Sequence, residues 1–428
     1  MKIAVIGAGI IGVTTAYELA CDGHEVTVFE RRGAAAEETS FANAGIVAPG
    51  YVTPWAAPGM PFKVLKHLFS RYAPVKVGLP LSGGELAWMW RWYRACTPKT
   101  YLASRTQLQR LAFYSRQRLR QITADRQLDY DRSDGYMVLL RSQSDSDMVQ
   151  AGLQLLRDAG VTFTELDAAG ARKIEPALNP ATEFLGAIHL PGDEVGNCRQ
   201  FCLLLKNETQ ALGVEFAFNT AVEGVAPSDR NGACGVKISG EAVPRAFDAV
   251  VMCAGLASAA LLRPLGLKIP MAAVYGYSLS APIREPLNAT SNATPNAPIS
   301  AVMDERFKVA ISRLGNRVRV AGSAEIGGTP EPHRASSIQT LYKVLNDWFP
   351  GAAAQTGGVQ IWKGARPMLP DGPPVIGPSG VPGLWLNLGH GSSGWALSCG
   401  SARLLADMLG KKAPALDCSG FAVERYVS

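Results

Sequence analysis

The stretch that decides the fold is Met1–Glu30, MKIAVIGAGIIGVTTAYELACDGHEVTVFE. An apolar, β-branched run at Lys2–Ile6 is followed by helical spacing at Ile10–Leu19 and by a second strand-like run at Glu25–Glu30. This order predicts a strand–helix–strand unit of the usual ~30 residues.

The first turn of this unit contains Gly7, Gly9 and Gly12 at G-x-G-x-x-G spacing. In such a turn the first glycine permits a tight bend, the second lets the backbone approach a pyrophosphate, and the third lets helix pack closely on strand. The N–H groups of Ile10 and Ile11 would face the phosphates at the positive end of the helix dipole. The pattern therefore predicts a dinucleotide site rather than three unrelated glycines.

Glu30 ends the second strand, where a carboxylate can accept hydrogen bonds from both ribose hydroxyls of an adenosine half. A 2′-phosphate would be repelled there, so NADP is disfavoured. Arg31 follows directly and is included in the expected cofactor site. The motif alone leaves FAD and NAD open.

The chain has 428 residues, 47% of them hydrophobic and 18% charged. Because single cores stop growing near ~250–300 residues, two domains are expected. The net charge of +6 comes without a run of like charges, so nucleic acid is not an expected partner. The eight cysteines fit neither a disulfide framework nor a zinc pattern, so no metal is expected. Cys198 and Cys202 are expected to be buried thiols on a helix, in a reducing compartment.

The first twenty residues resemble a signal peptide in hydropathy, but their glycines and Glu18 argue against one. No other uncharged apolar stretch reaches the ~18–20 residues that span a bilayer. We therefore expect a cytoplasmic protein, or one bound peripherally at the inner face of the cell membrane. The second alternative rests on the tryptophan-rich run at 88–93 with nearby basic residues, which fits either core packing or a membrane-interface patch.

The rest of the chain predicts a second domain inserted into the first. Residues 34–60 form an almost uncharged loop, either a surface connector or, as we favour, a ligand contact. Strands that alternate apolar and polar residues are expected near 271–280, 299–303, 307–312 and 317–321, with an exposed loop at 282–298.

Two later segments repeat the strand–glycine–helix pattern. The strand Ala249–Cys253 runs into Ala254 and Gly255, and the strand Leu384–Leu388 is followed by a glycine-rich turn and a helix at Trp395–Leu409. A helix N-terminus at this second turn would stabilise negative charge on a reduced isoalloxazine ring. FAD would use such a feature and NAD would not.

Together, GAGIIG with Glu30, TSFANAG (Thr39–Gly45), PGYVTPWAAPG, VYGYS (Val274–Ser278), RPMLPDGPPVIG and LGHGSSGW resemble the bacterial D-amino acid dehydrogenases. More broadly, the chain is similar to the flavoprotein superfamily of D-amino acid oxidase, glycine oxidase and sarcosine oxidase. The resemblance runs nearly from end to end. It implies an α/β fold with a discontinuous Rossmann-like FAD-binding domain of the GR2 type, at 1–48, 148–180, 193–270 and 356–428. It also implies a second α+β substrate domain built on an antiparallel sheet, at 49–147, 181–192 and 271–355.

The resemblance also implies site residues. Arg366 would pair with the substrate carboxylate, Tyr275 and Tyr277 would face the substrate, and His390 would act at a helix start, through its ring or backbone rather than as a base. The family has a lysine where this chain has Tyr275. FAD is expected to be non-covalent, because Met368, Leu369 and Pro370 stand where covalently flavinylated relatives place a cysteine. The remaining expected cofactor residues are Ser40, Asn43, Ala44, Gly45, Ile46, Val222, Ala254, Gly255, Gly389, Gly391, Ser392, Ser393, Gly394 and Trp395.

The implied reaction is oxidation of a D-amino acid to an imino acid, which water hydrolyses to a 2-oxo acid and ammonia. Hydride would pass from Cα to flavin N5, and the electrons would go on to a quinone or another acceptor. Two alternatives remain open: a related amine oxidase of glycine, sarcosine or D-hydroxyproline type that uses oxygen, and an NAD-linked dehydrogenase. The preferred amino acid and the oligomeric state do not follow from the sequence.

Overall fold

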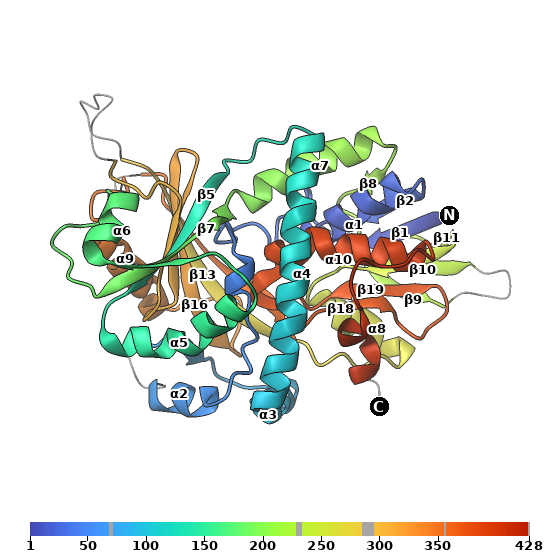
Figure 1. Cartoon of the computed structure of the whole chain (residues 1–428). Coiled ribbons are helices and arrows are strands. Elements are labelled where there is room, and N and C mark those ends of the chain that lie inside the picture. The colour runs from blue at the N-terminus through green and yellow to red at the C-terminus, as the bar shows by residue number, and fades with distance from the viewer. Residues whose placement is uncertain (68–71, 228–232, 285–294, 355–356, 427–428) are drawn as a thin grey trace.

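The computed structural model describes residues 1–67, 72–227, 233–284, 295–354 and 357–426. Two large sheets lie side by side with helices on their outer faces (Figure 1). Most of the 282–298 loop expected from the sequence lies outside these ranges.

The first sheet contains the amino-terminal strand at its centre. Strand β1 pairs in parallel with β2 on one side and with β12 on the other, and only the edge strand β18 runs antiparallel. A parallel sheet with crossover helices confirms the strand–helix–strand prediction. In sheet order the strands are β18 (Val375–Pro378), β19 (Leu384–Leu388), β12 (Ala249–Met252), β1 (Lys2–Ile6), β2 (Glu25–Phe29) and β8 (Glu215–Ala217).

Helices cover one face of this sheet, and a small sheet covers the other. The helical layer shares one apolar core with β1 and β2, and Cys198 and Cys202 are buried in it as expected. The helices are α1 (Ile10–Cys21), α4 (Pro98–Asp125), α7 (Cys198–Ala211) and α10 (Gly394–Leu409). The small sheet, β11 (Arg245–Phe247), β10 (Cys234–Ile238) and β9 (Val222–Ala226), packs on the opposite face together with α8 (Ala257–Leu262).

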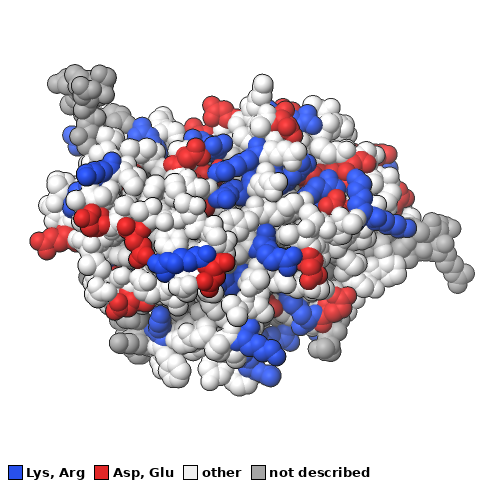
Figure 2. All heavy atoms as spheres, viewed as in Figure 1, with Lys and Arg blue, Asp and Glu red and all other residues white. Residues whose placement is uncertain are grey.

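A buried ion cluster joins three of these helices. Glu18 of α1 is completely buried and accepts hydrogen bonds from Arg118 of α4 and Arg403 of α10. Further arginines of α4 pair with Asp193 and Glu194. Basic and acidic side chains are accordingly interspersed on the face that carries α4 (Figure 2).

The second sheet is mainly antiparallel, as expected. Its strands in order are β17 (Gln360–Met368), β13 (Ala272–Pro282), β16 (Arg317–Ile326), β15 (Val309–Leu314), β14 (Ala301–Asp304), β5 (Ser133–Leu140), β7 (Gly186–Val195) and β3 (Ile46–Val47), with β4 (Val75–Val77) on β16 and β6 (Thr164–Asp167) on β7. Helices α6 (Ala168–Ile174) and α9 (Ala335–Trp348) pack on one face of the sheet. The other face turns toward the first sheet (Figure 1).

Three of the expected domain boundaries are wrong. Residues 148–180 belong with the second sheet, because β6 pairs with β7 and α5 (Gln143–Asp158) packs on β5. Within 49–147, helix α4 instead packs in the core of the first sheet. Within 356–428, strand β17 pairs with β13 of the second sheet. The local sequence of a helix or strand does not show which of the two sheets it will join or pack on.

The tryptophan-rich run forms the helix α3 (Gly83–Ala95), which follows α2 (Met60–His67). Trp88 and Trp92 are buried and stacked on each other, and the Trp88 indole N–H donates to the carbonyl of Met368. Trp90 and Tyr93 are exposed on the opposite side of the helix. The core-packing prediction is therefore right for Trp88 and Trp92 and wrong for Trp90. Within the described ranges, no helix is both long and apolar enough to cross a bilayer.

Candidate active site

Three glycine-rich turns meet at one edge of the first sheet. Strands β1, β12 and β19 run in parallel, so their carboxyl ends lie next to one another. Gly7 has a φ of +103°, and a Cβ there would lie 2.7 Å from the carbonyl oxygen of Cys253 at the end of β12. A Cβ on Gly12 would lie 1.8 Å from the carbonyl oxygen of Gly7, so only glycine lets α1 pack this closely.

A cavity of about 1110 Å³ extends from these turns to the second sheet. Ile10 at the start of α1 and the last glycine-rich turn border it, together with the 34–60 loop, which confirms that this loop lines a cavity rather than being only a surface connector. The expected cofactor residues on its wall are Ile10, Ser40, Asn43, Ala44, Ile46, Gly391, Ser392, Ser393, Gly394 and Trp395. The indole of Trp395 packs on Tyr130 and Phe201 in the core, which leaves its backbone for any cofactor contact.

Glu30 and Ser40 lie beside the first glycine turn and the start of α1. The Glu30 carboxylate accepts hydrogen bonds from the backbone N–H groups of Ala8 and Arg32, both at 2.8 Å, which hold it beside the first glycine turn. The Ser40 hydroxyl accepts from the N–H of Ile10 at the start of α1. This helix start has no acidic residue in its first turn. A negatively charged diphosphate therefore fits here.

Eleven expected cofactor residues lie outside the cavity wall: Gly7, Gly9, Ile11, Gly12, Glu30, Arg31, Gly45, Val222, Ala254, Gly255 and Gly389. Arg31 is half exposed and paired with Glu38, so it is committed to a surface ion pair. Val222 and Ala254 pack on the core cluster beside β1 and β2, and Gly255 follows with a φ of +54°. Val222, Ala254 and Gly255 therefore do not line the cavity.

The carboxylate-binding prediction for Arg366 has a clear geometric basis. Arg366 and Trp362 of β17 flank Gly364, which pairs with Gly276 of β13. A Cβ on Gly276 would lie 2.2 Å from Nη2 of Arg366, so the guanidinium lies across this glycine and borders the cavity. Its one hydrogen bond among the described residues goes to the carbonyl oxygen of Ser323, at 3.0 Å. Burial lowers the Arg366 pKa to about 10, which leaves the side chain charged at neutral pH.

Of the two tyrosines expected to face the substrate, Tyr277 borders the cavity and Tyr275 does not. Alternate residues of a strand point to opposite faces, and Gly276 takes the cavity face. The Tyr277 hydroxyl donates to Glu325 at 2.6 Å and accepts from the backbone N–H of Arg334 at the start of α9. The Tyr277 ring packs in the core beneath α9. Burial and the Glu325 carboxylate raise the pKa of its hydroxyl.

A lysine of the neighbouring strand lies beside Tyr275. The Lys363 ammonium of the neighbouring strand lies 4.7 Å from the centre of the Tyr275 ring and 3.5 Å from Glu325. A lysine therefore does occupy this region, but it comes from β17 rather than β13.

His390 has no catalytic position. Its imidazole is buried and lies 3.0 Å from the hydroxyl of Ser401 on α10, and it does not line the cavity. Burial lowers the His390 pKa to about 3, so the ring stays neutral at neutral pH. It fixes the turn after β19 to α10, which corrects its assignment as a catalytic residue. The adjacent Gly389 cannot carry a side chain, because a Cβ would lie 2.3 Å from Leu369.

The second sheet binds the 34–60 loop through side chains that the sequence did not single out. Arg319 of β16 donates to the carbonyl oxygens of Phe41 and Asn43, at 3.4 and 3.1 Å. Ser312 of β15 donates to the carbonyl oxygen of Ala44 at 2.7 Å. Gly45, with a φ of +89°, then bonds through its carbonyl to the N–H of Gly196. The two sheets are thus tied together through this loop.

The sequence also gave no indication of Ser323. This residue lies at a bulge in β16 opposite Tyr275–Tyr277 and has a φ of +57°, which is uncommon for a residue other than glycine. Its hydroxyl is buried without a partner among the described residues, and its carbonyl holds Arg366. A bulge of this kind depends on pairing between distant strands.

Comparison with known proteins assigns the class. Residues 2–408 match the family model described as FAD dependent oxidoreductase, DAO, and the chain belongs to that family. The family assignment excludes the NAD-linked alternative. The first glycine turn, the helix start at Ile10 and the last glycine turn on the cavity wall fit FAD in this chain.

Within this family, the chain is 42% identical to D-amino acid dehydrogenases from Cereibacter sphaeroides (strain ATCC 17029) and Bradyrhizobium diazoefficiens. The alignments cover 100% of the chain and 96% and 99% of those proteins. The fold is similar to glycine oxidase from Geobacillus kaustophilus, with a TM-score of 0.72 at 22% identity over 100% of both chains. It is also similar to L-proline dehydrogenase from P. horikoshii, with a TM-score of 0.74 at 16% identity over 100% and 97%.

Proposed function

We propose that this protein oxidises D-amino acids to 2-oxo acids and ammonia. The observation that carries the proposal is Arg366: a cation that borders the cavity, lies across Gly276 and has no carboxylate partner among the described residues. Guanidinium groups bind carboxylates through two parallel hydrogen bonds. The D-amino acid dehydrogenases that resemble this chain over their whole length support the substrate class.

FAD, when bound, accepts the two electrons that leave the amino acid. Arg366 would fix the substrate carboxylate, and the Ser323 carbonyl would fix the orientation of Arg366. The amine must be neutral to form the C=N bond of the imino acid, so activity is expected to rise with pH until the amine is deprotonated. His390 supplies no base, because it is buried outside the cavity wall. Water then hydrolyses the imino acid.

The test compares Arg366→Lys with Arg317→Lys. Arg317 lies on β16 of the same sheet but bonds Ser280 and Gly358, outside the cavity. A hydrogen bond to a charged group contributes ~1.5–3 kcal/mol, so Arg366→Lys should raise KM by about 10- to 100-fold with FAD still bound. Wild-type KM and kcat in Arg366→Lys would contradict the assignment. Anaerobic flavin bleaching with matched D- and L-amino acids, including proline and hydroxyproline, tests the substrate class directly.

We also propose that FAD is held without a covalent bond. Met368 is buried next to the last glycine turn, where a Cβ on Gly391 would lie 2.9 Å from its sulfur atom. No cysteine is among the cavity-lining residues of the described chain. Acid precipitation should therefore release the yellow chromophore into the supernatant, and a yellow pellet would contradict this proposal.

For the electron acceptor we propose a quinone reached at a membrane surface. Met60, Lys63 and Val64 of α2 border the cavity, and exposed basic residues accompany a group of exposed apolar side chains nearby. These apolar side chains are Phe62, Leu65, Leu79, Leu86, Trp90 and Tyr93. Exposed apolar patches with basic neighbours are typical of membrane-surface contacts.

Flotation with anionic liposomes tests the membrane contact, and Trp90→Ser with Phe62→Ser should abolish it without loss of activity toward a soluble dye. Protein that stays at the bottom of the gradient while reducing the dye would contradict it. Peroxide measured against quinone reduction in the same assay separates this acceptor from oxygen.

A further inference from the structure

The part of the cavity beyond Arg366 contains a second group of polar side chains, Tyr51, Tyr136 and Glu305. Glu305 is only 5% exposed, and its Oε2 has no hydrogen-bond partner in the described part of the chain. Its Oε1 pairs with Lys308, whose side chain is about half exposed. A buried carboxylate oxygen without a partner is costly, so its presence on a cavity wall points to a ligand.

Tyr136 of β5 lies on the cavity face of the second sheet, Tyr51 of the 34–60 loop packs against it, and Glu305 follows β14. Ala301 and Tyr136 share a core cluster with Met303 and Tyr51, whereas Val302 belongs to the core beneath α9. Glu305 is two residues after Met303 and four after Ala301, and side chains two apart on a strand point to the same face. The Glu305 side chain therefore also points to the cavity.

The two tyrosines offer hydroxyl groups beside this carboxylate. Their rings are in edge contact, with centres 5.7 Å apart. Neither hydroxyl has a protein hydrogen-bond partner among the residues described. Burial and the charge of Glu305 raise both pKa values, so the hydroxyls remain protonated. They can donate to, or accept from, a bound group.

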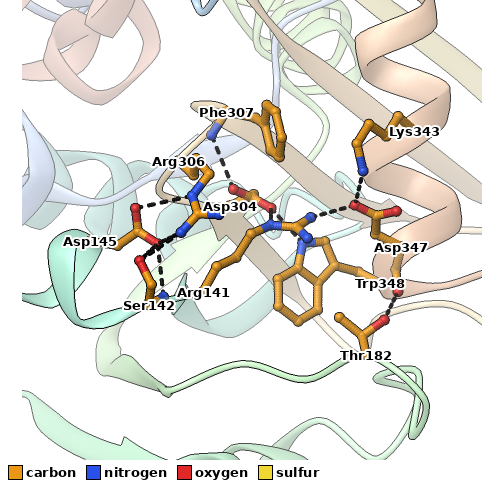
Figure 3. Close-up of polar contacts among 10 residues, drawn as sticks. All are labelled: Arg141, Ser142, Asp145, Thr182, Asp304, Arg306, Phe307, Lys343, Asp347 and Trp348. Atoms are coloured by element: carbon orange, nitrogen blue, oxygen red, sulfur yellow. Dashed lines mark hydrogen bonds and ion pairs between the residues drawn. The ribbon is translucent and has the colours of Figure 1, made fainter. Parts of the chain in front are cut away.

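The turn that carries Glu305 is held on both sides (Figure 3). The Asp304 carboxylate accepts hydrogen bonds from Arg141 and from the indole N–H of Trp348, both at 2.7 Å. It also accepts from the backbone N–H of Phe307 across the turn.

On the other side of Glu305, the Arg306 guanidinium donates to Asp145 at 2.8 Å and to Ser142 at 2.6 Å, at the start of α5 (Figure 3). Arg306 is therefore committed to α5 and is not available to neutralise Glu305. The backbone at Glu305 is fixed by both neighbours, so its free oxygen is pre-organised.

The distance from Arg366 suits an amino acid side chain. The Arg366 guanidinium lies above β13 and bonds to Ser323 on β16, while a Cβ on Gly322 would lie 2.9 Å from the carbonyl oxygen of Lys308 in the Glu305 turn. Glu305 directly follows β14, and from β16, where Ser323 holds Arg366, across β15 to β14 are two strand spacings of ~5 Å each. A carboxylate at Arg366 and a polar side-chain end at Glu305 can therefore belong to one ligand.

We propose that Tyr51, Tyr136 and Glu305 form a subsite for substrate side chains that end in an N–H donor, such as an amide or an ammonium. The proposal rests on the function proposed above and specifies its substrate class. Glu305 can only accept hydrogen bonds while it is ionised, so it favours an amide over the isosteric carboxylate. Sites built around buried polar groups discriminate strongly against ligands that leave those groups unpaired.

The test compares D-glutamine, D-glutamate and D-methionine, whose side chains are similar in length. We expect kcat/KM for D-glutamine to exceed that for D-glutamate by at least about tenfold. Glu305→Gln should reduce this ratio to below about threefold, and kcat/KM for D-methionine, whose side chain has no N–H donor, reports any general loss of activity in the variant. The control is Glu165→Gln, an exposed residue paired with Arg157 outside the cavity. A ratio near one, or a ratio that Glu305→Gln does not change, would overturn the subsite.

Binding without turnover separates this proposal from the function on which it rests. On the purified holoenzyme, 6-aminohexanoate should perturb the flavin absorbance at concentrations at least fivefold lower than hexanoate, and Glu305→Gln should remove the difference. Equal binding of the two ligands contradicts the subsite alone. Failure of every D-amino acid to bleach the flavin contradicts the proposed function alone. If Glu305→Gln does not fold, Tyr51→Phe takes its place, with an expected two- to fivefold loss of the D-glutamine preference.

Discussion

The guanidinium of Arg366 lies across the backbone of Gly276 on the neighbouring strand, so closely that a Cβ at position 276 would be 2.2 Å from Nη2. The two residues are ninety positions apart in sequence, and the antiparallel pairing of β13 with β17 brings them together. Arg366 can lie flat over the sheet only because Gly276 has no side chain.

Gly276→Ala should therefore displace Arg366 without removing its charge. We expect KM for the amino acid to rise about tenfold or more, with smaller changes in kcat and FAD content, because the clash affects substrate binding. Steady-state kinetics and the flavin-to-protein absorbance ratio measure this. Gly224→Ala is the control, because a Cβ there has no neighbour within 4 Å. Unchanged KM in Gly276→Ala would show that Arg366 does not bind substrate in this position.

Arg319→Lys should weaken FAD binding, because Arg319 holds the carbonyl oxygens of Phe41 and Asn43 on the loop that borders the cavity. An ammonium cannot reproduce the planar geometry of the guanidinium, so we expect the dissociation constant of FAD to rise by at least about fivefold. Flavin fluorescence during dilution measures the change. Arg317→Lys, on the same strand face, should retain wild-type affinity. Equal losses in both variants would indicate a general effect on the sheet.

Glu18→Gln should destabilise the fold strongly. The Glu18 carboxylate is completely buried between Arg118 and Arg403, and breaking such a cluster costs ~3–5 kcal/mol because buried cations lose their partner. Thermal unfolding of the apo and FAD-bound protein measures the loss. Glu25→Gln, whose side chain is largely exposed, should change stability by less than ~0.5 kcal/mol. Equal melting temperatures for the two variants would contradict the role of the cluster.

Glu175→Gln should stabilise the protein at pH 8 but not at pH 4.5. Burial raises the Glu175 pKa from its ordinary 4.5 to about 7, so the folded protein retains a proton that the unfolded chain has released. Wild-type stability should consequently fall as pH rises from 4.5 to 7, by ~1.4 kcal/mol per pKa unit at most. Glutamine has no charge to bury, so its advantage should be largest above pH 7. Denaturant unfolding at both pH values tests this, and parallel pH profiles would contradict it.

Local sequence was sufficient for the nucleotide-binding unit. Gly7, Gly9, Gly12 and Glu30 lie within thirty residues, and their spacing carries the geometry of the turn directly. The last glycine turn was found for the same reason, since strand, turn and helix follow one another in the chain. The substrate side was predicted less well. The expectation for Tyr275 was wrong, because the facing of its strand depends on pairing with the distant strand β17.

The sequence by itself determined the cofactor class and the two-sheet fold, because these depend on contiguous motifs and local patterns; Arg366 was chosen through the resemblance to the family. Only the tertiary structure decided that Gly276 leaves room for Arg366, that His390 is committed to Ser401, and that Tyr51, Tyr136 and Glu305 share one cavity wall. Strand register sets these relationships. A shift of one residue would turn each side chain to the opposite face, and that register is fixed by pairing between segments far apart in the chain.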